Sequence, residues 1–251
     1  MKKRSVLFVM IIVCLFFLNF KLIQAQQAKE NTDQEKAYLL GKFDPSKKIN
    51  FIKISSKYKV NGGNLYLRKE AYNAFSDMRK SALKDKITLN IVSATRNFDT
   101  QKTIWNNKWT GVTIVAGKNL KKSYPDELER FKKILEYSAV PGTSRHHFGT
   151  DIDINSVDPS YFNTTKGKKV YNWLNKNASK FGFCQPYNSG RKTGYNEEKW
   201  HFTYLPISKD LTSEYQKLIT DKDISGFFGD KYVPQMNLIN NYVLAINPAC
   251  L

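Results

Sequence analysis

The chain has 251 residues, of which 41% are hydrophobic and 25% are charged. This balance is typical of one globular domain with extensions, and it excludes a largely disordered chain and a polytopic membrane protein. Lys and Arg outnumber Asp and Glu by 40 to 22, which gives a net charge of +18. The three cysteines, Cys14, Cys184 and Cys250, form no CxxC pair, and this excludes zinc ribbons, iron–sulfur clusters and disulfide-dense scaffolds.

The N-terminus has the pattern of a cleaved secretory signal peptide. Residues 2–4 are basic, residues 5–20 are almost wholly apolar, and Ala25 supplies a small residue before a polar stretch. We therefore predict a signal peptide over residues 1–25 and an exported protein of the periplasm or cell envelope. An uncleaved anchor is the alternative, although the apolar run of 16 residues is short for a membrane span of ~20.

Export changes the meaning of the basic charge. The first 25 residues carry four basic and no acidic side chains, so the chain without them has a net charge of +14. Outside the cytoplasm this charge favours anionic envelope polymers or a carboxylate-rich substrate over nucleic acid, and a merely solvated basic surface is the alternative. Cys184 and Cys250 could pair in an oxidising compartment, but the sequence does not show whether they lie close together.

Helices and strands are mixed along the chain without a strict β-α-β order, which favours an α+β fold. Residues 26–40 are predicted to be a polar linker, residues 41–220 the folded domain, and residues 221–251 a C-terminal tail that packs on it. Residues 61–63, Asn-Gly-Gly, suggest a hairpin turn, and Asp99 is expected to cap a helix. Periodicity predicts helices over 68–84, 99–109, 126–137, 167–181 and 211–219, and strands over 87–93, 148–154 and 200–205.

All three histidines lie in two short segments that also carry carboxylates, residues 144–153 and 197–201. Two imidazoles and one carboxylate are the usual protein ligands of a catalytic zinc ion, which keeps one position open for water. The helical HExxH spacing is absent, so that class of metallopeptidase is excluded. A lone histidine is more often structural than a ligand, but the grouping of His146, His147 and His201 weakens that interpretation.

The first segment offers His146 and two carboxylates, Asp151 and Asp153. Gly149 between them would let the backbone bend close to a metal. Because side chains alternate along a strand, the two carboxylates share one face, and spacing alone leaves the choice between them open.

The second segment supplies His201 and, three residues earlier, Glu198. A carboxylate in that position could accept a proton from a metal-bound water and later donate it to a leaving amine. Zinc would supply the other half of the chemistry by lowering the pKa of the bound water to ~7. Spacing alone leaves metal binding and a structural role for the histidines both open.

The order Ser144-x-His146-x-x-Gly149-x-Asp151-x-Asp153, followed by Glu198-x-Trp200-His201, closely resembles the paired motifs of VanY-type D-alanyl-D-alanine carboxypeptidases. These enzymes belong to a group of zinc peptidases shared with lysostaphin-like enzymes and hedgehog-type domains. Their pattern is S-x-H-x-x-G-x-A-x-D and then E-x-W-H. The resemblance continues in residues 62–68 and 93–101 and covers about residues 50–205. It implies a zinc peptidase domain with a small antiparallel sheet that carries the site, flanked by helices.

Carried over by position, the resemblance implies that His146, Asp153 and His201 bind zinc. It makes Glu198 the general base and acid that acts on the zinc-bound water. Asp151 falls where the family usually has Ala, and we interpret it as a structural or supporting residue rather than a ligand.

The resemblance also assigns the substrate pocket. Arg96 matches the family's substrate arginine, placed to meet the substrate's carboxylate or the developing oxyanion, and a guanidinium can bind a carboxylate with two hydrogen bonds. Gln101 and Ser144 would help to hold the substrate. The family's usual S-G-Y-R-S reads S-A-T-R-N over residues 93–97, a departure in the substrate pocket and not in the metal ligands. His147 has no ligand role in the pattern and is interpreted as pocket wall or structural.

These implications predict a zinc-dependent D,D-carboxypeptidase that hydrolyses the terminal D-Ala-D-Ala bond of peptidoglycan stem peptides. An L,D-carboxypeptidase and a peptidoglycan endopeptidase that use the same site are alternatives. A non-catalytic zinc-bearing module that binds the cell wall is a further alternative. A nucleic-acid-binding function would be supported by the net charge alone. We expect a monomer whose partner is the stem peptide, with no nucleic acid and no stable membrane insertion after signal cleavage.

Overall fold

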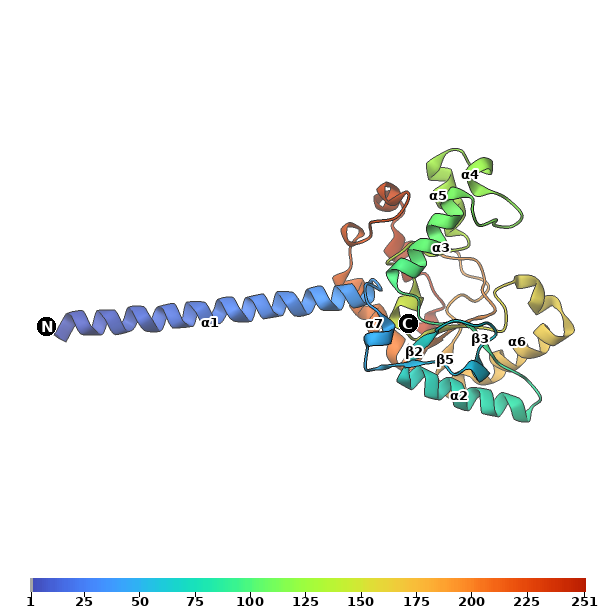
Figure 1. Ribbon diagram of the computed structural model, residues 1–251, viewed down its shortest axis with the longest axis horizontal. Helices are drawn as coiled ribbons and strands as arrows, with labels where there is room; N and C mark the ends of the chain where they lie inside the picture. The colour runs from blue at the N-terminus through green and yellow to red at the C-terminus, as the bar shows by residue number, and fades with distance from the viewer. Residues whose placement is uncertain (1) are drawn as a thin grey trace. The chain divides into compact units, whose positions relative to one another are not determined.

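The computed structural model describes the backbone of residues 2–251 and the side chains of residues 19–21 and 23–251. The chain divides into two compact units, residues 1–37 and 38–251, with the elements labelled in Figure 1. The first unit consists almost entirely of helix α1 (Lys2–Leu39), which also covers most of the predicted linker at residues 26–40. Most of the predicted signal peptide lies outside the residues whose side chains are described. Within the described part, no helix has the length and apolar character needed to cross a membrane.

The second unit is built on a four-stranded sheet with the order β3-β4-β6-β5, in which all neighbours are antiparallel. The register places Asp153 opposite His201 on one side and opposite Ser93 on the other. This arrangement confirms the expected α+β fold with a small antiparallel sheet. The strands are β3 (Ile91–Ser93), β4 (Asp151–Ile154), β5 (Phe183–Cys184) and β6 (His201–Tyr204), and a separate pair is β1 (Phe51–Lys53) and β2 (Tyr66–Arg68).

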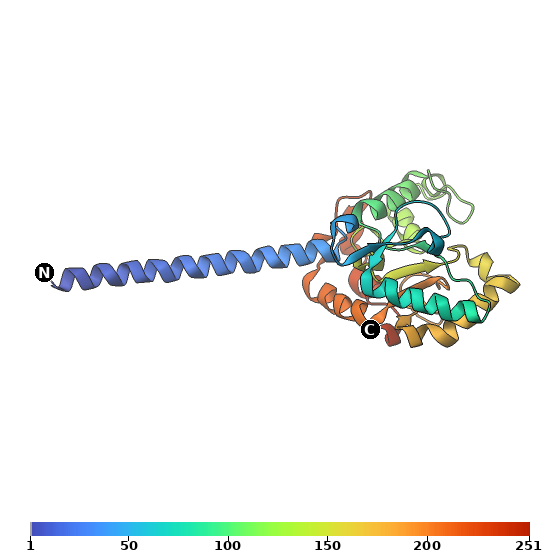
Figure 2. The same ribbon diagram turned by 60° about the horizontal axis from the view of Figure 1, so that its bottom comes forward.

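Helices α2 (Lys69–Lys84) and α6 (Thr165–Asn177) share a hydrophobic core with one face of the four-stranded sheet (Figure 2). Phe75 of α2 and Ile152 of β4 are both fully buried in this core. The other α-helices are α3 (Phe98–Thr110), α4 (Leu120–Ser123), α5 (Glu127–Leu135) and α7 (Leu205–Leu218). Short helical turns are η1 (Pro45–Lys47), η2 (Ser56–Tyr58), η3 (Arg145–Phe148), η4 (Pro159–Asn163), η5 (Ala178–Phe181), η6 (Asp221–Asp223), η7 (Asp230–Gln235), η8 (Ile239–Val243) and η9 (Pro248–Cys250).

A second core joins α3, α5 and α7 to the C-terminal segment, residues 221–251. Trp105 of α3 and Tyr215 of α7 are buried there with Val243 of the C-terminal segment. Cys250 of the same segment forms a disulfide with Cys184 of β5, with their Cα atoms 5.7 Å apart. The pairing that the sequence left open is therefore present, and it fastens the C-terminal segment to the edge strand of the sheet.

Two local predictions were wrong. The stretch around Asn-Gly-Gly at residues 61–63 does not form a hairpin, because β2 pairs with β1 while residues 59 and 60 bond to Ile91 instead. Asp99 does not cap α3, because Asn97 already accepts the N–H of Thr100 and the helix begins at Phe98.

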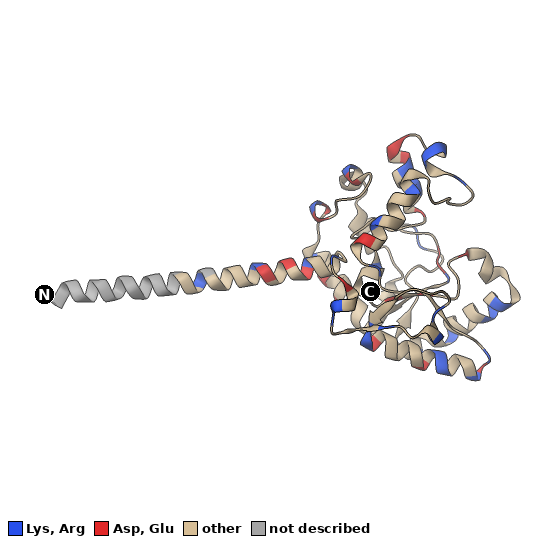
Figure 3. Ribbon diagram, in the orientation of Figure 1, with Lys and Arg blue, Asp and Glu red and all other residues tan. Residues whose placement is uncertain are grey.

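Within residues 38–251, Lys and Arg are found on many elements rather than on one. Lys and Arg occur on helices and loops throughout the second unit (Figure 3).

Candidate metal centre and active site

The alternation of side chains along β4 and β6 decides what reaches the site. Apolar residues of both strands point into the core shared with α2 and α6, so their polar neighbours point to the opposite face. Turn η3 ends at Gly149, whose φ of 74° is a left-handed conformation that favours glycine. The chain then enters β4, and this turn sets His146 beside Asp153 and His201.

Three buried side chains from these elements form one group that could hold a metal ion: His146, Asp153 and His201. Their ligand atoms all lie within 4.8 Å of one another. His146 Nε2 is 3.4 Å from Asp153 Oδ2, and His201 Nδ1 is 3.2 Å from Asp153 Oδ1. The structure thus brings together the three ligands expected from the sequence.

The hydrogen bonds around the two imidazoles leave the inward-facing nitrogens free. His146 Nδ1 is 2.7 Å from the carbonyl oxygen of Ala94, and His201 Nε2 is 2.9 Å from Asp151 Oδ1. Since both partners are acceptors, each of these nitrogens carries the proton. His146 Nε2, His201 Nδ1 and Asp153 Oδ1 are buried and form no hydrogen bond with any described residue. Buried acceptors without donors fit a cation, and this donor set is one that catalytic zinc uses.

The charges of the site also favour a cation. Burial, together with the nearby Arg96 guanidinium, lowers the pKa of His146, which keeps it a neutral ligand. Burial opposes ionisation of Asp153, but the His146 and His201 imidazoles hold its pKa well below the usual range. Burial alone would lower the pKa of His201, yet the surrounding carboxylates, Asp151 foremost, raise it well above the usual value. The acidic groups around His201 thus make this position favourable for a cation.

Glu198 lies at the edge of this group. Its Oε2 is 3.3 Å from His201 Nδ1, and its side chain keeps 19% of its surface exposed. The backbone is held from both sides, because Glu198 N–H donates to the carbonyl of Tyr187 and the Gln185 side chain donates to the carbonyl of Glu198. A fixed, partly solvated carboxylate beside the metal ligands is suited to proton transfer.

Arg96 is held over the site by its neighbours. Its Nη2 is 3.6 Å from Asp153 Oδ2, and its Nη1 donates to Gln101 Oε1 at 3.0 Å. Gln101 in turn donates to the carbonyl of Ala139 at 2.7 Å. Both ends of the Gln101 amide are therefore engaged, so Gln101 orients the Arg96 guanidinium, and its role as a substrate contact stays a prediction.

His147 holds the backbone of Arg96 and Gly142 in place through its two ring nitrogens. The ring is fully buried, its Nδ1 donates to the carbonyl of Arg96, and its Nε2 accepts the N–H of Gly142. Burial lowers the pKa of His147 to about 3, which keeps the ring neutral. A structural role was one of the two interpretations left open for this residue, and these contacts support it.

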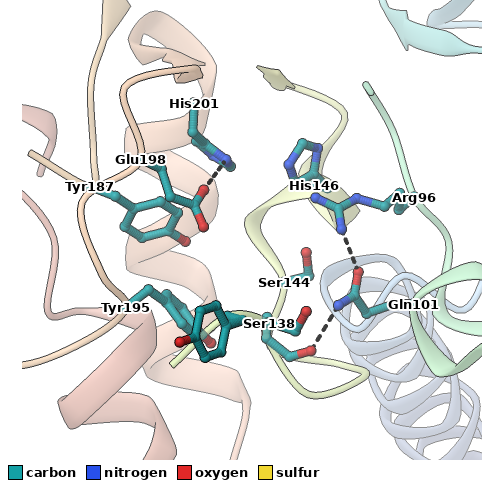
Figure 4. Close-up of a pocket in the computed structure, with 11 residues that line it drawn as sticks. Arg96, Gln101, Ser138, Ser144, His146, Tyr187, Tyr195, Glu198 and His201 are labelled. Carbon is teal, nitrogen blue, oxygen red and sulfur yellow. Dashed lines mark hydrogen bonds and ion pairs between the residues drawn. The ribbon is translucent and has the colours of Figure 1, made fainter. Parts of the chain in front are cut away.

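The candidate residues surround a small cavity of about 50 Å³ (Figure 4). Arg96, Gln101, Ser144 and Glu198 all line it, next to the inner sides of the metal ligands. A larger groove of about 830 Å³ adjoins it and shares Arg96 and Glu198 as lining residues. The groove is lined by apolar side chains, such as Trp200, and by charged ones, such as Lys108.

A protein-family comparison matches residues 64–207 to VanY, D-alanyl-D-alanine carboxypeptidase. This match spans more than half of the chain. The chain belongs to the VanY family. It is therefore a metallopeptidase, and the resemblance seen in the sequence motifs is confirmed.

Individual relatives agree with this assignment. The chain is 28% identical over 225 residues to "Putative carboxypeptidase YodJ" of Bacillus subtilis, which covers 84% of this chain and 72% of the relative. It is 36% identical over 86 residues to a D-alanyl-D-alanine carboxypeptidase of Enterococcus faecalis, covering 34% of this chain and 31% of that one. The solved structure of the LdcB LD-carboxypeptidase is 25% identical, with a TM-score of 0.50, and the match covers 71% of this chain and 81% of that one.

Two residues of this VanY-family site were missed in the sequence. The Tyr187 ring packs against the His201 ring with centroids 4.7 Å apart, and Tyr195 packs against Tyr187. Both tyrosines are buried and line the small cavity. They come from an irregular loop before the second motif, where no spacing pattern marks a contact. The hydrogen bond from Glu198 N–H to the Tyr187 carbonyl helps to hold that loop beside the site.

Proposed function

We propose that this VanY-family metallopeptidase is a zinc-dependent D,D-carboxypeptidase that removes the terminal D-alanine from peptidoglycan stem peptides. The observation that carries the proposal is the small cavity beside His146, Asp153 and His201. This cavity, lined by Arg96 and Ser144, could take one small terminal residue, whereas the adjoining groove could take the preceding peptide. The family description and the Enterococcus faecalis relative support the same bond.

The chemistry follows from the groups around the cavity. Zinc on His146, Asp153 and His201 would supply a Lewis acid that polarises the scissile carbonyl and acidifies the attacking water. Glu198 accepts the proton of that water as its oxygen attacks the carbonyl carbon. Glu198 then returns the proton to the departing amine of D-alanine as the C–N bond breaks. Each turnover therefore leaves the Glu198 carboxylate ready for the next water.

Arg96 and Ser144 hold the substrate in this proposal. Both line the small cavity (Figure 4), where a guanidinium and a hydroxyl can donate to the terminal carboxylate. Because Gln101 holds Arg96 through one guanidinium nitrogen, the cation is oriented before substrate arrives. This limits the entropy lost on binding.

An exopeptidase is favoured over an endopeptidase by the same cavity. An endopeptidase would need room for peptide on both sides of the scissile bond, whereas here the Arg96 guanidinium lines the small cavity, where it could bind a terminal carboxylate. An L,D-carboxypeptidase is the second candidate, because the chain resembles the LdcB LD-carboxypeptidase over 71% of its length. Either activity uses the same metal ligands and the same carboxylate.

Three defined substrates separate these activities. The purified protein with one equivalent of zinc is incubated with a pentapeptide stem, a tetrapeptide stem and a crosslinked dimer, and the products are identified by mass spectrometry. The proposal predicts D-alanine and tetrapeptide from the pentapeptide, with the other two substrates unchanged. Tripeptide from the tetrapeptide would instead establish L,D-activity, and monomers from the dimer would establish an endopeptidase.

We also propose that the protein works outside the cytoplasm, in the periplasm or cell envelope. The signal-peptide pattern of residues 1–25 supports this location. The disulfide between Cys184 and Cys250 supports it as well, since such bonds persist in oxidising compartments. Fractionation of cells that express the full chain, with detection of the mature N-terminus by sequencing, tests both features. Recovery of the uncleaved protein in the cytoplasm would contradict this location.

A further inference from the structure

A second carboxylate lies directly behind one of the metal ligands. Asp151 is fully buried on β4, at the position where the family motif usually has Ala. Its Oδ1 accepts from His201 Nε2 at 2.9 Å and from Arg145 Nε at 3.2 Å. Its Oδ2 accepts from the hydroxyls of Thr150 and Thr203 at 2.7 and 2.8 Å. Both oxygens are therefore saturated with donors.

Arg145 completes this network with a full set of buried partners. Its side chain is fully buried, and it bonds to Asp151 through Nε. Its Nη1 donates to Thr212 on α7 at 2.9 Å, and its Nη2 donates to Thr203 on β6 at 3.2 Å. The guanidinium thus balances the charge of the carboxylate and fixes its position against two other elements. Burial of a lone carboxylate at this depth would be strongly unfavourable.

The geometry excludes Asp151 as a direct ligand in this arrangement. It touches Nε2 of His201, whereas Nδ1 of the same ring faces His146 and Asp153. The carboxylate and the metal position therefore lie on opposite sides of the imidazole. A hydrogen bond on the far nitrogen fixes the tautomer and the orientation of a metal-binding histidine and makes it a stronger donor.

We propose that Asp151, supported by Arg145, is a positioning residue that holds His201 with its Nδ1 lone pair directed at the metal. The inference rests on the proposed zinc site but not on which peptide bond is cleaved. The buried pair joins β4 to η3, and its hydrogen bonds extend to Thr203 on β6 and Thr212 on α7.

Zinc affinity measures this role independently of activity. The double variant Asp151→Ala/Arg145→Met removes both charges together, so that neither partner is left buried and unpaired. Competition with a chromophoric chelator gives its zinc dissociation constant, and circular dichroism reports its fold. We expect a folded protein with zinc affinity 10–100-fold weaker than wild type, the range typical for loss of such a partner. A folded double variant within threefold of the wild-type affinity would overturn the proposal.

A matched control perturbs the same network without touching His201. Thr212→Val removes one hydrogen bond from Arg145 but keeps the contact between Asp151 and the imidazole. Its zinc affinity should stay within threefold of wild type. A loss as large as in the double variant would show that general loosening of the network, and not the contact with His201, lowers zinc affinity.

A measurement on the wild-type chain decides the matter if the double variant does not fold. Long-range ¹H–¹⁵N NMR of the imidazoles in the zinc-loaded protein should show His201 coordinated through Nδ1, with a slowly exchanging proton on Nε2. Coordination through Nε2 would overturn the proposal. A wild-type chain that binds zinc with this signature but releases no D-alanine would refute the proposed function and leave the role of Asp151 intact.

Discussion

Loss of the disulfide between Cys184 and Cys250 is expected to destabilise the fold by about 4 kcal/mol. The two residues are separated by 66 positions, and closing a loop of that length removes about 4 kcal/mol of conformational entropy from the unfolded chain at 25 °C. Cys250 is fully buried, so the disulfide lies within the packed core and holds the C-terminal segment against β5. In a chain of this size, such a loss corresponds to a melting temperature lower by roughly 8–16 °C.

The double variant Cys184→Ala/Cys250→Ala tests this value in urea unfolding followed by tryptophan fluorescence. Substitution is preferable to a reducing agent, because many thiols bind zinc and would disturb the metal site as well. Ser189→Ala, at an exposed position, serves as the matched control and should unfold like the wild type. A double variant within 1 kcal/mol of the wild type would refute the loop-closure reasoning and show that core contacts alone hold the segment.

Three other substitutions report on separate features. Burial lowers the pKa of Lys108 to about 8 in the folded protein, whereas the usual value is ~10.4. Between these two pH values the unfolded chain binds more protons than the folded chain, so the free energy of unfolding of the wild type should rise with pH. Urea titrations of Lys108→Met should show no such rise. Gly149→Ala should lower stability by roughly 2–4 kcal/mol in the same assay, because φ is 74° and a Cβ would lie 2.4 Å from the Phe51 ring; unchanged stability would contradict this. Gln101→Met should lower kcat/KM about tenfold by freeing Arg96, with zinc content unchanged; wild-type kinetics would contradict its orienting role.

The metal ligands could be predicted from the sequence because the information that places them is local. His146, Gly149 and Asp153 lie within one turn and one strand, and alternation along that strand fixes which side chains share a face. His201 enters through a second short motif on the adjacent strand. Spacing alone left open both whether the histidines bind a metal and which of Asp151 and Asp153 is the ligand, and the resemblance to the VanY motifs was needed for both. In the structure, Asp153 faces the two histidines, and Asp151 is held on the far side of His201 by Arg145.

Features that depend on contacts between distant segments could not be predicted. The disulfide joins residues 66 positions apart, and nothing near Cys184 or Cys250 indicates that they meet. Tyr187 reaches the site through an irregular loop that has no periodicity. The hairpin expected at residues 61–63 fails for the same reason, because β2 finds its partner in β1 across a longer connection. Turn residues signal a change of direction, but the surrounding core decides which strands pair.

In the proposed mechanism, Glu198 transfers the proton at a zinc centre formed by His146, Asp153 and His201. Release of D-alanine from a pentapeptide stem is measured for the wild type with zinc, the wild type with chelator, Glu198→Ala, and the control Glu214→Ala at an exposed position of α7. We expect one zinc per chain in both variants, loss of release with chelator, a 10²–10⁴-fold lower rate for Glu198→Ala, and the wild-type rate for Glu214→Ala. Release by Glu198→Ala at the wild-type rate, or release unaffected by the chelator, would contradict the claim.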